Sequence, residues 1–167
     1  MNKLTNISTP KVSIVMGSAS DMPVVEKTIN TLKSFGVEVE AMVCSAHRTP
    51  EIAADFAKNA RANGSDVIIA AAGKAAHLPG VLAAFTTLPI VGLPIKSSLM
   101  DGLDSLLSIV QMPSGVPVAT VAVNGAENAA VLAVQIMSLK YSELETKLDE
   151  YKKAMKEKVI ESNKSIQ

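Results

Sequence analysis

The sequence predicts an α/β fold: a three-layer, doubly wound parallel sheet of five strands, with an extra helix at the C-terminus. Short apolar runs that are typical of buried strands alternate five times with segments that carry helix start and stop signals. Between Val67 and Leu139 only five side chains are charged, which favours strands buried on both faces and apolar surface hidden against other subunits. A surface of small Ala, Ser and Gly side chains is the alternative explanation of this charge-poor segment.

The first expected strand is residues 12–16, an apolar run that Gly17 closes. Ser20 or Asp21 can cap the helix that follows, because a side-chain oxygen there can accept a hydrogen bond from the first turn. This helix is expected to stop at Gly36, since glycine is common just past a helix end.

The second expected strand, residues 37–43, alternates apolar and polar side chains. Thr49 is the expected cap of a second helix, and Pro50 suits its first position, where a missing N–H costs nothing. This helix is expected to end near residues 63–64, where Asn and Gly stand.

The remaining strands of the sheet are short apolar runs bounded by turn residues. They are expected at residues 67–72, 89–93 and 117–123. Helices are expected over residues 79–85 and 104–110, and Asn124 is the expected cap of an Ala-rich helix after the last strand.

A further helix is expected as a C-terminal arm over residues 140–160. Ser142 and Glu145 form a capping box at its start. Its single apolar stripe consists of Leu144, Leu148, Tyr151 and Met155. Because the sheet already has helices for both faces, we expect the stripe to pack against a neighbouring subunit. Folding back on its own subunit is the alternative.

The domain organisation follows from these elements. We expect a disordered leader (residues 1–10), a single catalytic domain (11–139), the helical arm (140–160) and a tail (161–167). Net charge is zero and aromatic residues make up 3%, so nucleic-acid binding is not expected. The lack of a long apolar run or a signal core, with one cysteine, predicts a cytoplasmic protein that does not engage a membrane.

Five alternations of strand and helix predict the strand order 2-1-3-4-5 with right-handed crossovers, a flavodoxin-like arrangement. Ligands bind such sheets outside the carboxyl ends of the strands, where the direction of winding switches. Three loops at those ends carry candidate residues: residues 17–21, 45–49 and 72–77.

The first of these loops reads GSASD and matches neither a dinucleotide-binding GxGxxG motif nor a Walker A motif. Its hydroxyls and backbone N–H groups at a helix N-terminus can bind an anion. Asp21 would repel a phosphate, and its carboxylate is better suited to accepting hydrogen bonds from ribose hydroxyls. The residues alone leave helix capping and ligand contact as equal alternatives.

The second loop contains His47 and Arg48. Arginine offers a planar set of donors that suits phosphate oxygens, and histidine can both give and take a proton near neutral pH. An isolated histidine is usually structural, but a histidine beside an arginine at a strand end favours a proton-transfer role for His47.

The third loop consists of small residues and glycines, which let backbone approach a ligand closely. His77 within it can be catalytic, but a hydrogen bond to loop backbone is the favoured role. Cys44, His47 and His77 lack the number and spacing of zinc ligands, so no metal site is expected. The sequence also contains no GxSxG motif of a serine hydrolase.

Together these loops resemble the PurE family, the N5-carboxyaminoimidazole ribonucleotide mutases of purine synthesis. The resemblance runs from residue 11 to about 155, through VMGSASD at 15–21, SAHRTP at 45–50, AAHLPG at 75–80, GLDSLLSIVQMPSGVPVATVAV at 102–123 and NGAENAAVLAVQI at 124–136. The stretch DSLLSIVQMP at 104–113 is similar to the bacterial class I mutases rather than to the carboxylases that use CO₂. Ala71, Lys74 and Lys96 depart from the residues that are usual in the family.

The resemblance implies an isomerase that needs no metal, nucleotide cofactor or biotin and acts on a small phosphorylated nucleotide. It implies that His47 is the general acid/base. Substrate binding is implied for Ser18, Asp21 and Arg48, for Ser20 and Ser45 at the phosphate, and for Gly17, Gly73, Ala75, Ala76 and His77 around the rest of the ligand. A homo-octamer is implied as well.

The residues suit the implied reaction, which moves a carboxylate from the exocyclic N5 to ring carbon C4 of an aminoimidazole ribonucleotide. A carbamate can release CO₂ inside a closed pocket, and the electron-rich C4 can capture it. One histidine can perform both proton transfers, a task typically worth roughly 10²–10⁴ in rate. Two alternatives are a lyase that carboxylates the aminoimidazole ribonucleotide directly with CO₂, and a non-catalytic nucleotide-binding module, which would leave His47 without a purpose.

Overall fold

The computed structural model describes residues 9–164 and residue 166 of the chain. Five parallel strands form one sheet in the order β2-β1-β3-β4-β5, which confirms the predicted order. The strands are β1 (Lys11–Met16), β2 (Glu38–Val43), β3 (Val67–Gly73), β4 (Ile90–Ile95) and β5 (Ala119–Thr120). Most of the predicted leader, residues 1–8, lies outside the described residues.

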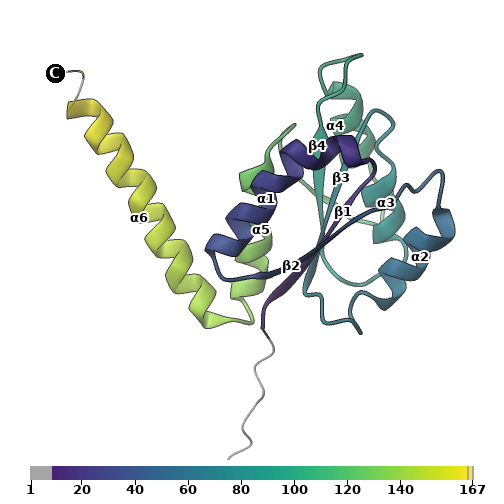
Figure 1. Ribbon diagram of the computed structural model, residues 1–167, viewed down its shortest axis with the longest axis horizontal. Helices are drawn as coiled ribbons and strands as arrows, with labels where there is room; N and C mark the ends of the chain where they lie inside the picture. The colour runs from purple at the N-terminus through teal and green to yellow at the C-terminus, as the bar shows by residue number, and fades with distance from the viewer. Residues whose placement is uncertain (1–8, 165, 167) are drawn as a thin grey trace, which may run out of the picture.

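Helices cover both faces of the sheet and make the three predicted layers (Figure 1). A 3₁₀ turn, η1 (Ala19–Asp21), precedes the first helix. The helices are α1 (Met22–Ser34), α2 (Pro50–Asn59), α3 (Leu78–Ala83), α4 (Leu103–Val110), α5 (Ala126–Ser138) and α6 (Ser142–Lys164). No helix among the described residues has the length and apolar character needed to cross a membrane.

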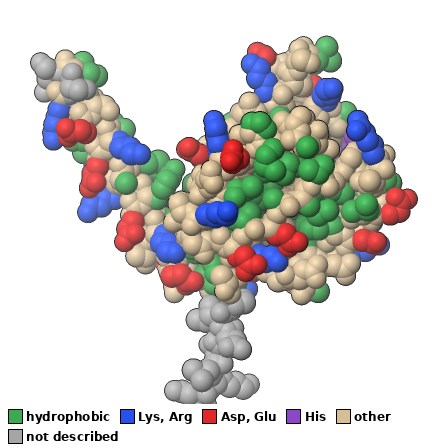
Figure 2. All heavy atoms as spheres, in the orientation of Figure 1, with side chains coloured by type: hydrophobic (Ala, Val, Ile, Leu, Met, Phe, Trp, Pro, Cys, Tyr) green, Lys and Arg blue, Asp and Glu red, His purple; other side chains and the backbone are tan. Residues whose placement is uncertain are grey.

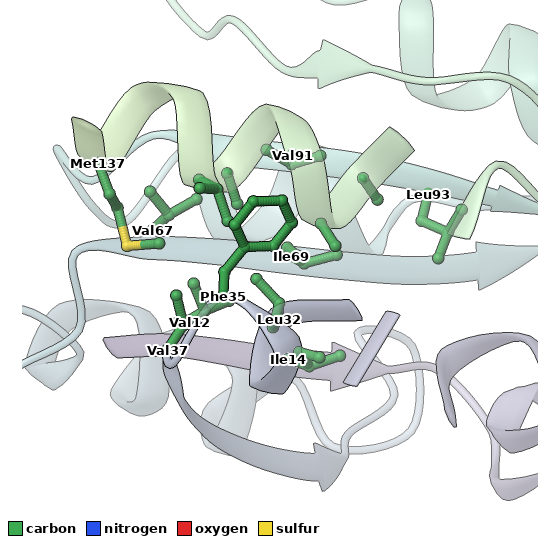
Figure 3. Packing of buried hydrophobic residues seen from close by; sticks show 14 of the residues in the cluster. Val12, Ile14, Leu32, Phe35, Val37, Val67, Ile69, Val91, Leu93 and Met137 are labelled. Carbon is green, nitrogen blue, oxygen red and sulfur yellow. The ribbon is translucent and has the colours of Figure 1, made fainter. Parts of the chain in front are cut away.

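The two central strands β1 and β3 are buried on both faces, because successive side chains of a strand point to opposite sides. Val12 and Ile14 of β1 pack with α1 and α5, whereas Val15 packs with α2 and α3. Ile69 and Ile68 of β3 divide in the same way, and Figure 3 shows the first of these two clusters between helix and sheet. This double burial explains the lack of charge in these strands.

The predicted caps of the first helix are wrong. Asp21 stands at the N-cap position of α1, but its side chain makes no capping bond, and neither does that of Ser20. The capping side chain is Ser18, whose hydroxyl accepts a 3.3 Å bond from the Ser20 backbone N–H at the start of η1. The inserted 3₁₀ turn moves the helix start, and the Asp21 carboxyl does not cap the helix end.

Two further predicted caps hold loops together rather than helix ends. The Thr49 hydroxyl bonds to the backbone N–H and C=O of Ser45, at 3.2 and 2.9 Å, and so closes the turn before α2. The Asn124 carboxamide oxygen accepts a 2.9 Å bond from the Lys96 backbone N–H, while Gly125 occupies the N-cap position of α5. Both side chains fix loops at the carboxyl edge of the sheet.

Two predicted elements are shorter in the structure. Helix α2 ends at Asn59, and turns carry the chain on to Gly64, which has a φ of +88°. Strand β5 pairs with β4 over two residues, although the backbone N–H groups of Val121 and Asn124 still bond to the carbonyls of Gly92 and Pro94 in β4.

The apolar stripe of α6 divides between two environments. Leu144 and Leu148 are buried in the core of their own subunit, and the Tyr151 ring contacts Phe35 with centroids 5.4 Å apart. The prediction that the whole stripe packs against a neighbour is therefore wrong for these three residues. Beyond them the helix projects away from the body, and Met155 is 45% exposed (Figures 1 and 2).

Candidate functional site

The loops after β1, β2, β3 and β4 converge on one cavity of about 340 Å³ at the carboxyl edge of the sheet. This is the edge and the switch point at which the fold predicts a ligand, and the volume suits a small molecule. Of the predicted site residues all but one line the cavity. The exception is Ala76, which is 1% exposed and belongs to the hydrophobic cluster under α2 and α3.

The loop after β1 brings two hydroxyls and a carboxyl to the cavity. The Ser20 hydroxyl donates a 2.8 Å bond to the Ser18 hydroxyl, which orients both side chains. Asp21 is buried, and this burial raises the pKa of its carboxyl, although hydrogen bonds from Ser18 and Ser20 act in the opposite direction. A buried carboxylate at the wall of a cavity is a strong acceptor for ligand hydroxyls.

The loop after β2 is a compact turn before α2. The Arg48 backbone N–H bonds to the carbonyl of Ser45 at 3.2 Å and to its hydroxyl at 3.3 Å. The Arg48 side chain is exposed, and it makes no ion pair with any residue that the structure describes. Its donors are therefore available to an anion in the cavity.

The two histidines of the chain meet across the cavity wall. His47 Nε2 lies 2.8 Å from His77 Nδ1, and the rings contact edge to face with centroids 5.0 Å apart. One of these two nitrogens must carry the shared proton. The contact leaves His47 Nδ1 and His77 Nε2 free of that bond, and it joins His77 to His47 rather than to loop backbone.

The loop after β3 begins with a close approach of backbone. A Cβ at Gly73 would stand 3.4 Å from the carbonyl oxygen of Ile95 in β4, an ordinary van der Waals contact, so the backbones of β3 and β4 lie close together here. Ala75 and His77 follow on the cavity wall.

The loop after β4 also lines the cavity, as its position at a strand end predicts, although no site residue was predicted in it. The Ser97 hydroxyl bonds to both carboxylate oxygens of Asp104 at 2.8 Å, which ties this loop to α4. Lys96 forms an ion pair with Asp101 at 3.0 Å. Its position at the end of a strand was the one signal in the sequence that this loop belongs to the site, because its residues form no recognisable motif.

The charges around the cavity favour an anionic ligand. Arg48, Lys74 and Lys96 line it, against the single carboxylate of Asp21 among the described lining residues. Within the described part of the chain, no group of three or more His, Cys, Asp or Glu side chains is placed to hold a metal ion. The arrangement can bind a phosphate and exchange a proton with a bound molecule.

Comparison with known proteins gives consistent results. The family described as AIR carboxylase matches residues 11–158. The N5-carboxyaminoimidazole ribonucleotide mutase of Pyrococcus horikoshii is 56% identical over 95% of this chain and 89% of that protein. Its counterpart in Thermotoga maritima is 52% identical over 95% of this chain and 92% of that protein. The crystal structure of Treponema denticola PurE is 33% identical, with a TM-score of 0.87, over 95% of this chain and 99% of that one.

Proposed function

The chain belongs to the AIR carboxylase family, and we propose that it is an isomerase of purine biosynthesis that converts N5-carboxyaminoimidazole ribonucleotide to 4-carboxy-5-aminoimidazole ribonucleotide. The single observation that carries this proposal is the His47–His77 pair beside Arg48 in one cavity. It combines a proton carrier with an anion-binding side chain, as a reaction on a phosphorylated nucleotide requires.

The nucleotide part of the substrate binds to the loops after β1 and β2. Arg48 and the hydroxyls of Ser18, Ser20 and Ser45 supply donors for the phosphate. Asp21 accepts hydrogen bonds from the ribose hydroxyls, because its buried carboxyl lies on the same wall. With the phosphate and the ribose bound in this way, the aminoimidazole ring of the nucleotide lies toward the histidines.

The chemistry needs one proton to move from C4 to N5. His47 donates a proton to N5 as the N5–carbon bond breaks and CO₂ leaves. The C4 atom then attacks CO₂, and neutral His47 removes the C4 proton, which restores both the aromatic ring and the starting form of the histidine. The reaction is balanced without another reactant, and His47 makes no covalent bond to the substrate.

His77 acts as a positioning residue in this scheme. When His77 Nδ1 accepts the proton of His47 Nε2, the Nδ1 atom of His47 is the one left to exchange protons with the substrate. The loop between Gly73 and His77 lines the same cavity, and in this proposal it holds released CO₂ beside C4.

The test is an assay of the purified protein with N5-carboxyaminoimidazole ribonucleotide, following the appearance of the C4 carboxylate. We expect conversion without added bicarbonate. A lyase would instead need 5-aminoimidazole ribonucleotide and bicarbonate. Formation of the product from that mixture, with none from N5-carboxyaminoimidazole ribonucleotide, would refute the isomerase. Failure of both reactions would refute an enzymatic role in this step.

We also propose that the protein is cytoplasmic and forms a homo-oligomer. Its resemblance to the family suggests an octamer. Two features support assembly. Helix α4 exposes Leu103, Leu107 and Val110 by 45–50%, and Leu99 before it is 81% exposed. The projecting end of α6 adds further apolar side chains that the subunit does not cover.

A further inference from the structure

Lys74 lines the cavity but has no part in the proposed reaction. It follows directly after the last residue of β3, and its φ is +57°, in the left-handed region that favours glycine. An L-residue with a long side chain adopts this conformation at a cost in free energy, whereas glycine would adopt it freely. Backbone geometry alone therefore favours glycine here, and the presence of lysine points to a use for its side chain.

The loop holds Lys74 close to the reacting end of the cavity. The Ala76 N–H bonds to the Lys74 carbonyl at 2.8 Å, and the His77 N–H bonds to the Ala75 carbonyl at the same distance. These two tight turns fix Lys74 near His77, whose ring contacts His47. Because His47 must reach the atoms that exchange protons, the reacting end of the substrate lies beside this loop.

The ammonium of Lys74 is available to a ligand. Lys96, the other lysine at the cavity, is paired with Asp101 at 3.0 Å. Lys74 has no ion pair or side-chain hydrogen bond to any residue that the structure describes. Asp21, the acidic residue of the described cavity wall, lies on the loop after β1 and forms no ion pair with Lys74.

The two unpaired cations suit the two anionic groups of the substrate. Arg48 follows β2 and Lys74 follows β3, with β1 between these strands, so their loops start about 10 Å apart at the usual strand spacing. The phosphate and the carboxylate stand at opposite ends of a carboxylated aminoimidazole ribonucleotide. With the phosphate at Arg48, the carboxylate comes to the loop of Lys74.

We propose that the Lys74 ammonium binds the carboxylate of the substrate and of the product, and so makes the site select carboxylated aminoimidazole ribonucleotides. This inference rests on the proposed function, since it assigns a group of that substrate. The contact is a charge-assisted hydrogen bond, which a neutral CO₂ does not form. Lys74 therefore acts on ligand affinity rather than on proton transfer.

The test measures the equilibrium binding of two ligands by calorimetry: 4-carboxy-5-aminoimidazole ribonucleotide, and 5-aminoimidazole ribonucleotide, which lacks the carboxylate. Lys74→Gln keeps a polar side chain, one atom shorter, and the strained backbone but removes the charge. We expect its Kd for the carboxylated ligand to rise about 3- to 10-fold, the range of a partly exposed ion pair, with the other Kd unchanged. Lys74→Arg keeps the charge and should retain most of the affinity.

Lys58→Gln is the matched control, because it makes the same change on α2, outside the cavity. It should leave both dissociation constants unchanged. An equal loss for both ligands in Lys74→Gln, or no loss for either, would overturn the proposal. A wild-type protein that binds the carboxylated ligand but catalyses no isomerisation would refute the proposed reaction alone, whereas binding of neither ligand would refute both.

Discussion

His47 Nε2 and His77 Nδ1 lie 2.8 Å apart, so two histidines separated by 30 positions in the chain act on one proton. The sequence predicted His47 as the proton carrier and favoured a hydrogen bond to loop backbone for His77, with catalysis as the alternative. The structure shows that the Nδ1 atom of His77 bonds to His47 and not to the loop backbone, which favours a positioning role for His77. Each of the two histidines can be tested separately.

Replacing His47 with Asn should leave the fold intact and reduce kcat by at least about 10²-fold, because Asn keeps polarity but neither gains nor releases a proton near pH 7. The side chain is exposed at the cavity, so little packing is lost. Steady-state turnover and a thermal melt of the same sample check both points. Near-normal turnover in His47→Asn would contradict the mechanism.

His77→Ala should reduce kcat roughly 10-fold with little change in KM, because His47 loses the group that orients it. His77→Asn retains an oxygen that can accept the His47 proton, and it should recover most of the lost rate. A purely structural role would make both variants alike, and in that case kcat and KM would change together.

Arg48→Ala should raise KM about 10-fold or more, because it removes a charge-assisted contact to the phosphate. Some loss of kcat is expected too, since the phosphate contact positions the base at His47. Ligand binding at two salt concentrations gives a second measure, with a weaker salt dependence in the variant. An unchanged KM would show that Arg48 does not bind the substrate.

Asp21→Asn should stabilise the free protein at neutral pH while it weakens substrate binding. Burial raises the pKa of Asp21 in the folded state, so its contribution to stability is complete below the ordinary carboxyl pKa and is lost as pH rises through the raised value. At pH 7 the charged carboxyl is held in the fold at a cost that Asn avoids, and we expect a gain in Tm of about 1–3 °C.

Thermal melts of both proteins between pH 4.5 and 8 check this prediction. The difference in Tm should shrink toward acidic pH, as the wild-type carboxyl becomes protonated. A lower Tm for Asp21→Asn at pH 7 would mean that the hydrogen bonds from Ser18 and Ser20 to the carboxylate outweigh its burial.

The order of the strands and the position of the cavity could be predicted from the sequence, because both follow from local patterns and general rules of chain connection. Alternating apolar runs such as residues 12–16 identify buried strands, and parallel strands align their carboxyl ends at one edge. Residues at those ends, such as Ser18 and Arg48, were therefore placed correctly on the cavity.

Partners that lie far apart in the chain could not be predicted in this way. Asn124 has a residue type suited to helix capping, but its oxygen bonds to the Lys96 backbone, 28 residues away. Ala76 stands between two cavity residues, yet its methyl group turns into the core. Neither the left-handed backbone of Lys74 nor the ring contact of Tyr151 with Phe35 has a sequence signal, since both depend on tertiary packing.

The projecting end of α6 should hold a neighbouring subunit. Met155, Val159 and Ile160 are 45–63% exposed there, and Met155 and Val159 continue the apolar side of the helix that Leu148 and Tyr151 begin. Removing the whole helix would also remove Leu144, which is fully buried in the core, and would confuse folding with assembly.

A truncation after Ala154 spares the buried turns and removes the projecting part. We expect this variant to keep its fold by circular dichroism but to form a smaller assembly when its mass is measured by light scattering. Val159→Glu should act in the same direction, whereas Lys152→Glu, another exposed position of α6, should not. An unchanged mass in both the truncated protein and Val159→Glu would show that the projecting helix takes no part in assembly.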